Sequence, residues 1–256
     1  SLLPKQLSGR SVLPRAASLE TLRNTSATIS DLVVEIIVIE QDNSALRRTP
    51  IILRGEAVWI SGKDNGEDPV LVTNAHWLLQ ASAILLRPGK DRPTGALPKV
   101  QRRSLKDAAL GSDAKSILAD PALVPLEVLH ADKHRNLAVL GGEKLAAPKI
   151  GLKLFDIDRQ AATAIYGFSH KMGSTLVQAR FLTPKDKSSE LLFYLHTTYP
   201  VILGAPLLSE DGRVISLTAM RHPKQAERTL AIPPRALRKF LDKVQAPPAS
   251  DGPAGE

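Results

Sequence analysis

The sequence predicts an all-β protein that ends in one amphipathic helix, and three features of the chain support this fold class. Residues 31–40 are rich in β-branched side chains, which favours a largely buried strand. Further short apolar segments are separated by turn-rich stretches such as 62–69 and 184–189. After two consecutive prolines, apolar side chains recur at helical spacing, which predicts a helix over residues 234–244.

The composition is that of a globular protein. The 256 residues are 43% hydrophobic, and no apolar run is long enough to span a bilayer. Cysteine is absent, which excludes disulfides, thiolate metal ligands and a cysteine nucleophile, and leaves the cellular compartment undetermined. Because the chain begins at Ser1 rather than at methionine, a signal peptide or anchor removed upstream stays an open alternative.

The chain is basic, with 34 lysines and arginines against 26 acidic residues and a net charge of +8. Such a balance suits acidic partners or a charged membrane surface. Nucleic-acid binders, however, tend to cluster basic side chains or to interleave them with aromatic ones. Here the basic residues are spread along the chain and aromatic residues make up 4%. We expect protein partners rather than nucleic acid, and the sequence leaves membrane contact open.

The stretch over residues 199–208 has the form of a nucleophile loop that lacks its nucleophile. It reads Tyr-Pro-Val-Ile-Leu-Gly-Ala-Pro-Leu-Leu, and Gly-Arg-Val-Ile follows at 212–215. The two segments resemble the Gly-Asn-Ser-Gly-Gly-Pro-Leu loop and the Gly-Arg-Val-Ile-Gly strand of trypsin-like serine proteases of the bacterial HtrA type. In this resemblance, Leu203 lies at the position of the reactive serine.

Two upstream segments resemble the same family. Residues 70–78, Val-Leu-Val-Thr-Asn-Ala-His-Trp-Leu, are similar to the segment that presents the catalytic histidine, which corresponds to His76. Residues 136–140, Asn-Leu-Ala-Val-Leu, are similar to the Asp-Leu-Ala-Val-Leu segment that carries the triad aspartate, which corresponds to Asn136. The histidine, acid and nucleophile positions therefore follow each other in the trypsin order.

The resemblance implies a trypsin-like double β-barrel with a C-terminal helix over residues 17–244. The first barrel is expected at about 30–142, the second barrel at about 150–232, and the helix at 234–244. Trypsin-like barrels of this length count as one domain although they have two cores.

We expect partner contacts at three elements outside the expected barrel cores: the N-terminal arm, the connection over 88–125 and the basic C-terminal helix. Residues 1–16 form an N-terminal arm, and residues 245–256 form a tail that is expected to be disordered. The connection over 88–125 is longer than the one usual in the family, and long connections are often functional. The basic side chains in this connection and in the C-terminal helix are Arg102, Arg103, Lys106, Arg235, Arg238 and Lys239.

The residues at the three triad positions predict the loss of proteolysis. A serine protease needs a nucleophilic hydroxyl, an imidazole that takes its proton and usually a carboxylate that orients the imidazole. Leu203 offers no nucleophile, and replacing the acid of a serine protease costs on the order of 10⁴ in rate. Asn136 alone would be less decisive, because an amide orients the histidine in cysteine proteases.

Two details leave alternatives open. Val201 and Ala205 stand where the family has glycines of the oxyanion hole, although their backbone amides could still form a pocket. The serine and threonine hydroxyl groups nearest in sequence to Leu203 belong to Thr197, Thr198 and Ser209, five or six residues away. An active peptidase with such an unusual nucleophile is therefore a further alternative.

A metal site is the second alternative. His130 and His134 are four residues apart with Asp132 between them, which on a helix would place both imidazoles on one face. The resemblance places them instead in a turn between strands, which weakens this interpretation. Three further histidines could join them only through the fold, namely His170, His196 and His222.

We therefore predict a catalytically inactive trypsin-like protein that acts as a binding or scaffold subunit of a larger assembly. No cofactor is expected. The alternatives are a repurposed fold that binds a transition metal through surface histidines, and the peptidase with an unusual nucleophile. The resemblance by itself suggests the periplasm or another exported compartment.

Overall fold

The computed structural model describes residues 29–40, 50–61, 68–88, 112–156, 165–170, 175–182, 192–195, 202–221 and 228–245. The expected N-terminal arm, the basic residues Arg102, Arg103 and Lys106, and the tail beyond Gln245 lie outside the described residues.

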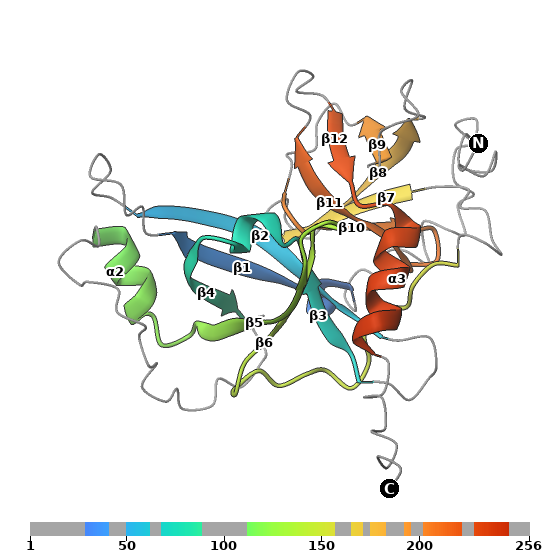
Figure 1. Ribbon diagram of the computed structural model, residues 1–256. Coiled ribbons are helices and arrows are strands. Elements are labelled where there is room, and N and C mark those ends of the chain that lie inside the picture. Colours follow the sequence, from blue (N-terminus) through green and yellow to red (C-terminus); the bar gives the residue numbers. More distant parts are fainter. Residues whose placement is uncertain are drawn as a thin grey trace, which may run out of the picture.

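Strands dominate the described chain (Figure 1). The N-terminal half contains β1 (Val33–Glu40), β2 (Ile51–Ile60), β3 (Val70–Thr73), the 3-10 turn η2 (His76–Leu78), β4 (Ala81–Arg87), α2 (Ser112–Ala119), β5 (Val124–Asp132) and β6 (Leu137–Gly141). The C-terminal half contains β7 (Ile165–Ser169), β8 (Thr175–Leu182), β9 (Leu192–Leu195), β10 (Pro206–Ser209), β11 (Val214–Arg221), β12 (Arg228–Ala231) and α3 (Pro234–Val244).

The first six strands close into a barrel in the order β1-β2-β3-β6-β5-β4. All neighbouring strands in it are antiparallel. The β-branched run predicted from the sequence becomes β1, which pairs with β2 on one edge and β4 on the other. β1 is thus paired on both edges, and its side chains are buried along most of its length.

The remaining six strands form a second antiparallel sheet in the order β10-β11-β12-β9-β8-β7. In this sheet β10 pairs with β11 on one edge and with β7 on the other. The hairpin between β10 and β11 has Gly212 at φ 78°, a left-handed conformation that glycine adopts without steric cost.

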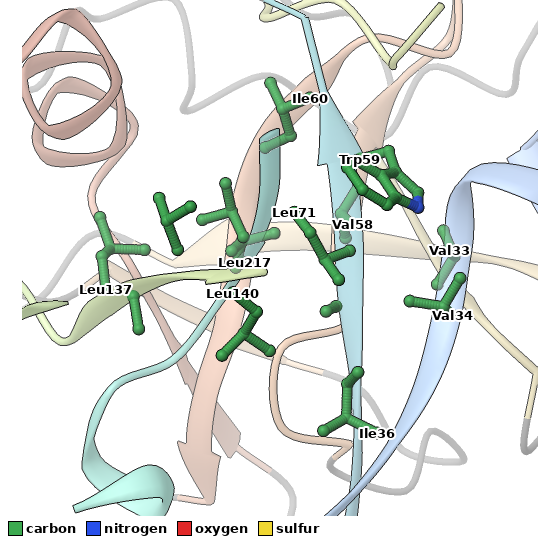
Figure 2. Packing of buried hydrophobic residues seen from close by; sticks show 14 of the residues in the cluster. Val33, Val34, Ile36, Val58, Trp59, Ile60, Leu71, Leu137, Leu140 and Leu217 are labelled. Atoms are coloured by element: carbon green, nitrogen blue, oxygen red, sulfur yellow. The ribbon is translucent and has the colours of Figure 1, made fainter. Parts of the chain in front are cut away.

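One hydrophobic cluster joins the two sheets and the C-terminal helix. Figure 2 shows part of it, including Leu71 and Leu140 of the barrel and Leu217 of β11. The helix α3 adds Leu237, Phe240 and Leu241, which are buried on the face predicted from their spacing. The apolar face of α3 is therefore used inside this chain.

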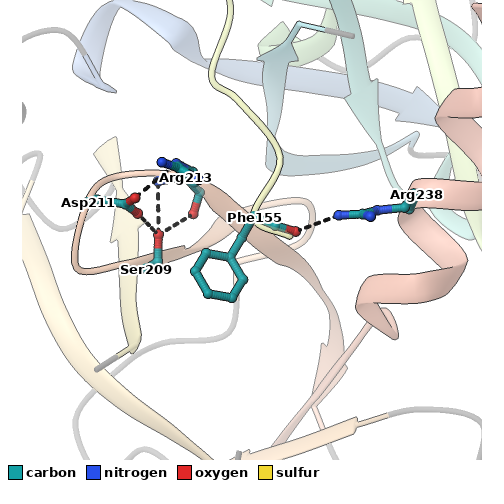
Figure 3. A network of polar contacts seen from close by, with 5 residues as sticks. All are labelled: Phe155, Ser209, Asp211, Arg213 and Arg238. Carbon is teal, nitrogen blue, oxygen red and sulfur yellow. Dashed lines mark hydrogen bonds and ion pairs between the residues drawn. The ribbon is translucent and has the colours of Figure 1, made fainter. Parts of the chain in front are cut away.

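Polar contacts also fix α3 to the segment that connects the two sheets. The Arg238 guanidinium donates a hydrogen bond to the Phe155 carbonyl oxygen at 3.1 Å (Figure 3). It also donates one to Asp156 Oδ1 at 3.1 Å. Within the same segment, the Leu152 N–H donates to the Trp59 carbonyl oxygen of β2, and the Phe155 N–H donates to the Val214 carbonyl oxygen of β11. The connecting segment thus bonds to both sheets and to the helix.

The all-β class, a barrel in the N-terminal half and the C-terminal helix are confirmed, while some element boundaries differ. Asp31 and Leu32 are helical, so the first strand starts at Val33 rather than at residue 31. Asn136 lies in the turn before β6 with φ 55°. Asparagine tolerates this left-handed conformation better than most residues, so it suits a turn.

The connection over 88–125 is partly regular, and the sequence pattern predicts a helix in it around residues 104–118. It contains α2, and its last residues already belong to β5. Among the described residues, no helix has the length and apolar character needed to cross a membrane.

Candidate functional site

His76 is presented by the turn that follows β3. Thr73, the last residue of β3, pairs with Ala138 of β6, which fixes the start of this turn. Ala75 and Trp77 on either side of His76 are buried, whereas His76 itself is exposed. The core therefore anchors the turn through the neighbours of His76 and leaves its imidazole at the surface.

His76 and Asn136 are directly hydrogen bonded. The side-chain oxygen Oδ1 of Asn136 lies 2.8 Å from the backbone N of His76 and 3.0 Å from its ring atom Nδ1. The backbone N–H can only donate, so the facing Asn136 atom must be its acceptor oxygen. That oxygen cannot donate to the ring, so Nδ1 carries the hydrogen and neutral His76 keeps its lone pair at Nε2.

The turn that carries Asn136 is held by an acid at its start. Asp132 Oδ1 accepts a hydrogen bond from the Arg135 N–H at 2.9 Å, and Oδ2 contacts the Arg135 guanidinium. Burial raises the pKa of Asp132, but the hydrogen bonds and charge of Arg135 outweigh it and hold the pKa of this carboxyl below its usual range. Asp132 is thus expected to be ionised near neutral pH.

The loop that carries Leu203 has a tightly constrained backbone. The Leu203 carbonyl oxygen accepts a hydrogen bond from the Glu56 N–H at 2.7 Å. Gly204 has φ 78°, and a β-carbon there would lie 1.9 Å from the Glu56 carbonyl oxygen. Only glycine combines this conformation with so close an approach to another backbone.

The backbone amides that follow Leu203 are used within the fold. The Gly204 N–H donates to the Thr218 carbonyl oxygen at 3.0 Å, and the Ala205 N–H donates to the Ile202 carbonyl oxygen at 3.3 Å. Neither donor is therefore directed at a ligand in this structure. Val201, the other residue expected at an oxyanion hole, lies outside the described residues.

Gly55 of β2 brings the histidine turn and the Leu203 loop to the same strand. A β-carbon at Gly55 would lie 2.5 Å from the Trp77 ring and 2.8 Å from the Leu203 carbonyl oxygen. Glycine at this position therefore leaves room for both neighbours. His76 and Asn136 are in contact, and the Leu203 carbonyl oxygen and the Trp77 ring both lie beside Gly55.

A buried acid beside this loop was missed by the sequence analysis. Glu56 of β2 is 2% exposed, and its Oε1 accepts hydrogen bonds from the Ser169 hydroxyl and the His170 N–H, both at 2.7 Å. His170 Nε2 lies 2.6 Å from the Val33 carbonyl oxygen, which can only accept, so Nε2 carries a hydrogen. An acid inside the apolar run of β2 was the signal that could have drawn attention to it.

The alternative nucleophiles and metal ligands are placed as follows. Ser209 is buried in the β10–β11 hairpin, where its hydroxyl contacts Asp211 and Arg213 (Figure 3). His130 lies on β5 with its ring 5.6 Å from that of Phe240, whereas His134 is exposed in the following turn. His196, His222, Thr197 and Thr198 lie outside the described residues.

Within the described residues, no group of three or more histidines and acids is arranged to hold a metal ion. Comparison with known proteins matches the chain to no family model and to no curated protein.

Proposed function

We propose that this chain is a proteolytically inactive relative of the trypsin-like proteases that acts as a binding or scaffold subunit. The observation that carries the proposal is the combination of a bonded His76–Asn136 pair with leucine at position 203. The pair has the geometry that orients an imidazole base, and the base has no hydroxyl to activate at position 203.

The strand arrangement supports the same proposal. The second sheet shares its core with the first barrel, and its β10 pairs on both edges. We extend this arrangement to a second closed barrel, which makes the molecule a trypsin-like double barrel. The Leu203 loop and the His76 turn then lie where the two barrels meet, as the contacts of Gly55 suggest.

Proteolytic inactivity is tested with the purified protein, casein, fluorogenic peptides and a fluorophosphonate probe. We expect no cleavage and no labelling, because a leucine side chain cannot form a covalent adduct with the probe. Stoichiometric labelling would refute the proposal. A label that mapped to Ser209, Thr197 or Thr198 would instead establish the peptidase alternative.

A double variant provides a positive control for the assigned positions. Leu203→Ser with Asn136→Asp restores a hydroxyl and a carboxylate around His76, and the same variant with His76→Ala is its matched control. If the three positions form one site, only the first variant should label with the probe. Equal labelling of both variants would place the serine away from the imidazole and contradict the assignment.

The binding role is tested by affinity purification from the native source. We expect a partner to copurify at fixed stoichiometry and to remain through size-exclusion chromatography. Deletion of residues 1–16 should weaken this complex, as the sequence analysis predicts, with little change in melting temperature. A protein that elutes alone under these conditions would contradict a role as a subunit.

A further inference from the structure

Two exposed apolar side chains are adjacent on β5. Val128 is 39% exposed and Leu129 is 61% exposed, and the other large exposed apolar side chains of the described residues are Leu79 at 53% and Ile150 at 69%. Single exposed apolar residues are ordinary on protein surfaces. An adjacent exposed pair on a strand can instead mark a docking surface if the strand also has an unpaired edge.

The pairing of β5 leaves such an edge. Its first residues, Val124–Leu126, pair with β4, and the register with β4 ends there. Of its later residues, Glu127, Val128 and His130–Asp132 pair with β6 on one side, and Leu129 is the extra residue of a bulge in this pairing. On the other side they have no strand partner in the described part of the chain. We call Glu127–Asp132 the β5 edge.

The register between β4 and β5 shows which residues would face the β5 edge if pairing continued. Ile84 pairs with Leu126, so continued pairing in the same register would have placed Ala81 opposite Leu129. Leu79 is exposed and precedes Ala81 by two residues, so the same register would place it opposite Ala131, near the C-terminal end of the β5 edge.

The β5 edge also carries opposite charges at its two ends. Glu127 is exposed at the start, and Lys133 is exposed just after the last edge residue, with exposed His134 beside it. An unpaired strand edge offers backbone donors and acceptors to an extended chain. An antiparallel strand would match these charges if it had an acidic residue at its N-terminal end, apolar residues in the middle and a basic residue at its C-terminal end.

We propose that the β5 edge binds an extended segment of a protein partner by antiparallel strand addition. The segment covers Val128 and Leu129, places its acidic end near Lys133 and its basic end near Glu127. This inference rests on the proposed binding role and specifies the chemistry of the partner at one surface.

The probe is a fluorescein-labelled peptide, Asp-Glu-Val-Thr-Val-Thr-Val-Lys-Lys with blocked ends, titrated against the full chain and followed by anisotropy. We expect saturable binding. The same peptide with alternate backbone N-methyl groups should bind at least about tenfold more weakly, because it cannot form the strand ladder. A peptide with the acidic and basic ends exchanged should also bind more weakly.

Two variants locate the site. Leu129→Lys should weaken peptide binding by at least about tenfold, whereas Ile150→Lys, which changes an equally exposed apolar residue away from the edge, should leave it unchanged. Val128→Lys repeats the test if Leu129→Lys lowers the melting temperature. Equal effects of the edge variants and of Ile150→Lys, no saturable binding, or tolerance of N-methylation would each overturn the proposal.

Two further outcomes separate this inference from the proposed function. A partner complex from the native source that forms equally well with Leu129→Lys would refute the β5 edge and leave the binding role standing. Self-association in analytical ultracentrifugation that Leu129→Lys abolishes would identify a second copy of the chain as the occupant. That result would overturn the proposal that the β5 edge binds a separate protein.

Discussion

The histidine turn and the Leu203 loop are both held in place by hydrogen bonds, yet they differ in which atoms form these bonds. In the histidine turn, the side chains of His76 and Asn136 form the bonds themselves. In the Leu203 loop, backbone atoms form the bonds, through the Leu203 carbonyl oxygen and Gly204 N–H. A loop held by its backbone can keep its shape when the side chain at its centre changes, which explains how a leucine is accommodated.

The largest expected effect follows from breaking the backbone of the Leu203 loop. Gly204→Ala places a β-carbon against the Glu56 carbonyl oxygen in a left-handed conformation. We expect a loss of roughly 3 kcal/mol or more in the free energy of unfolding, or failure to fold, because rigid backbone blocks the added atom. Urea denaturation measures this loss.

Gly212→Ala is the matched control, because Gly212 also has φ 78°. Gly212→Ala should lower the free energy of unfolding by about 1–2 kcal/mol, which is the penalty for an L-residue in the left-handed region. Equal losses for the two variants would mean that the close approach at Gly204 is unimportant and that conformation alone explains both.

A smaller effect is expected at the acid that links the two sheets. Glu56→Ala removes the acceptor shared by the Ser169 hydroxyl and the His170 N–H, and we expect a loss of about 2–3 kcal/mol. Glu56→Gln keeps an acceptor oxygen, so its loss in the free energy of unfolding should be clearly smaller. Thermal and urea unfolding compare the two, and an equally stable Glu56→Ala would show that this link does not stabilise the fold.

The side-chain bonds of the histidine turn are tested by Asn136→Gly. Glycine keeps the positive φ and removes only the amide, so we expect a loss of about 1 kcal/mol. Long-range ¹H–¹⁵N spectra should show wild-type His76 with its hydrogen on Nδ1 and the variant as a mixture of tautomers. His170, whose Nε2 carries a hydrogen, should be unchanged in both. A wild-type His76 already present as a mixture would contradict the bonded pair.

The smallest effect concerns the acid at the start of the Asn136 turn. The pKa of Asp132 is lower in the folded protein than its usual value, so the folded state favours the ionised form. Its contribution to stability is therefore present above about pH 4 and is lost as the pH falls through the folded pKa. Asp132→Asn should lower the free energy of unfolding at neutral pH. The difference in this free energy between the variant and wild type should become smaller in acid. A difference that is independent of pH would contradict this contribution.

Several features of this protein follow from the sequence alone because they depend on local patterns. The β-branched run of β1 and the spacing of Leu237, Phe240 and Leu241 predict a strand and a helix face, and the structure has both. The structure brings His76 and Asn136 into hydrogen-bonding contact, and their assignment as former triad positions stays a prediction. The assignment of Leu203 as the former nucleophile position stays a prediction.

Tertiary structure decided the features that depend on contacts between distant segments. Glu56 reads in the sequence as an ordinary polar residue in a strand, and only the fold brings Ser169 and His170 to its carboxylate across more than 110 residues. Likewise, the extent of the β5 edge depends on where the register with β4 ends. Local periodicity determines which residues become strand or helix, whereas the packing of remote segments determines which polar groups are buried together and which edges stay unpaired.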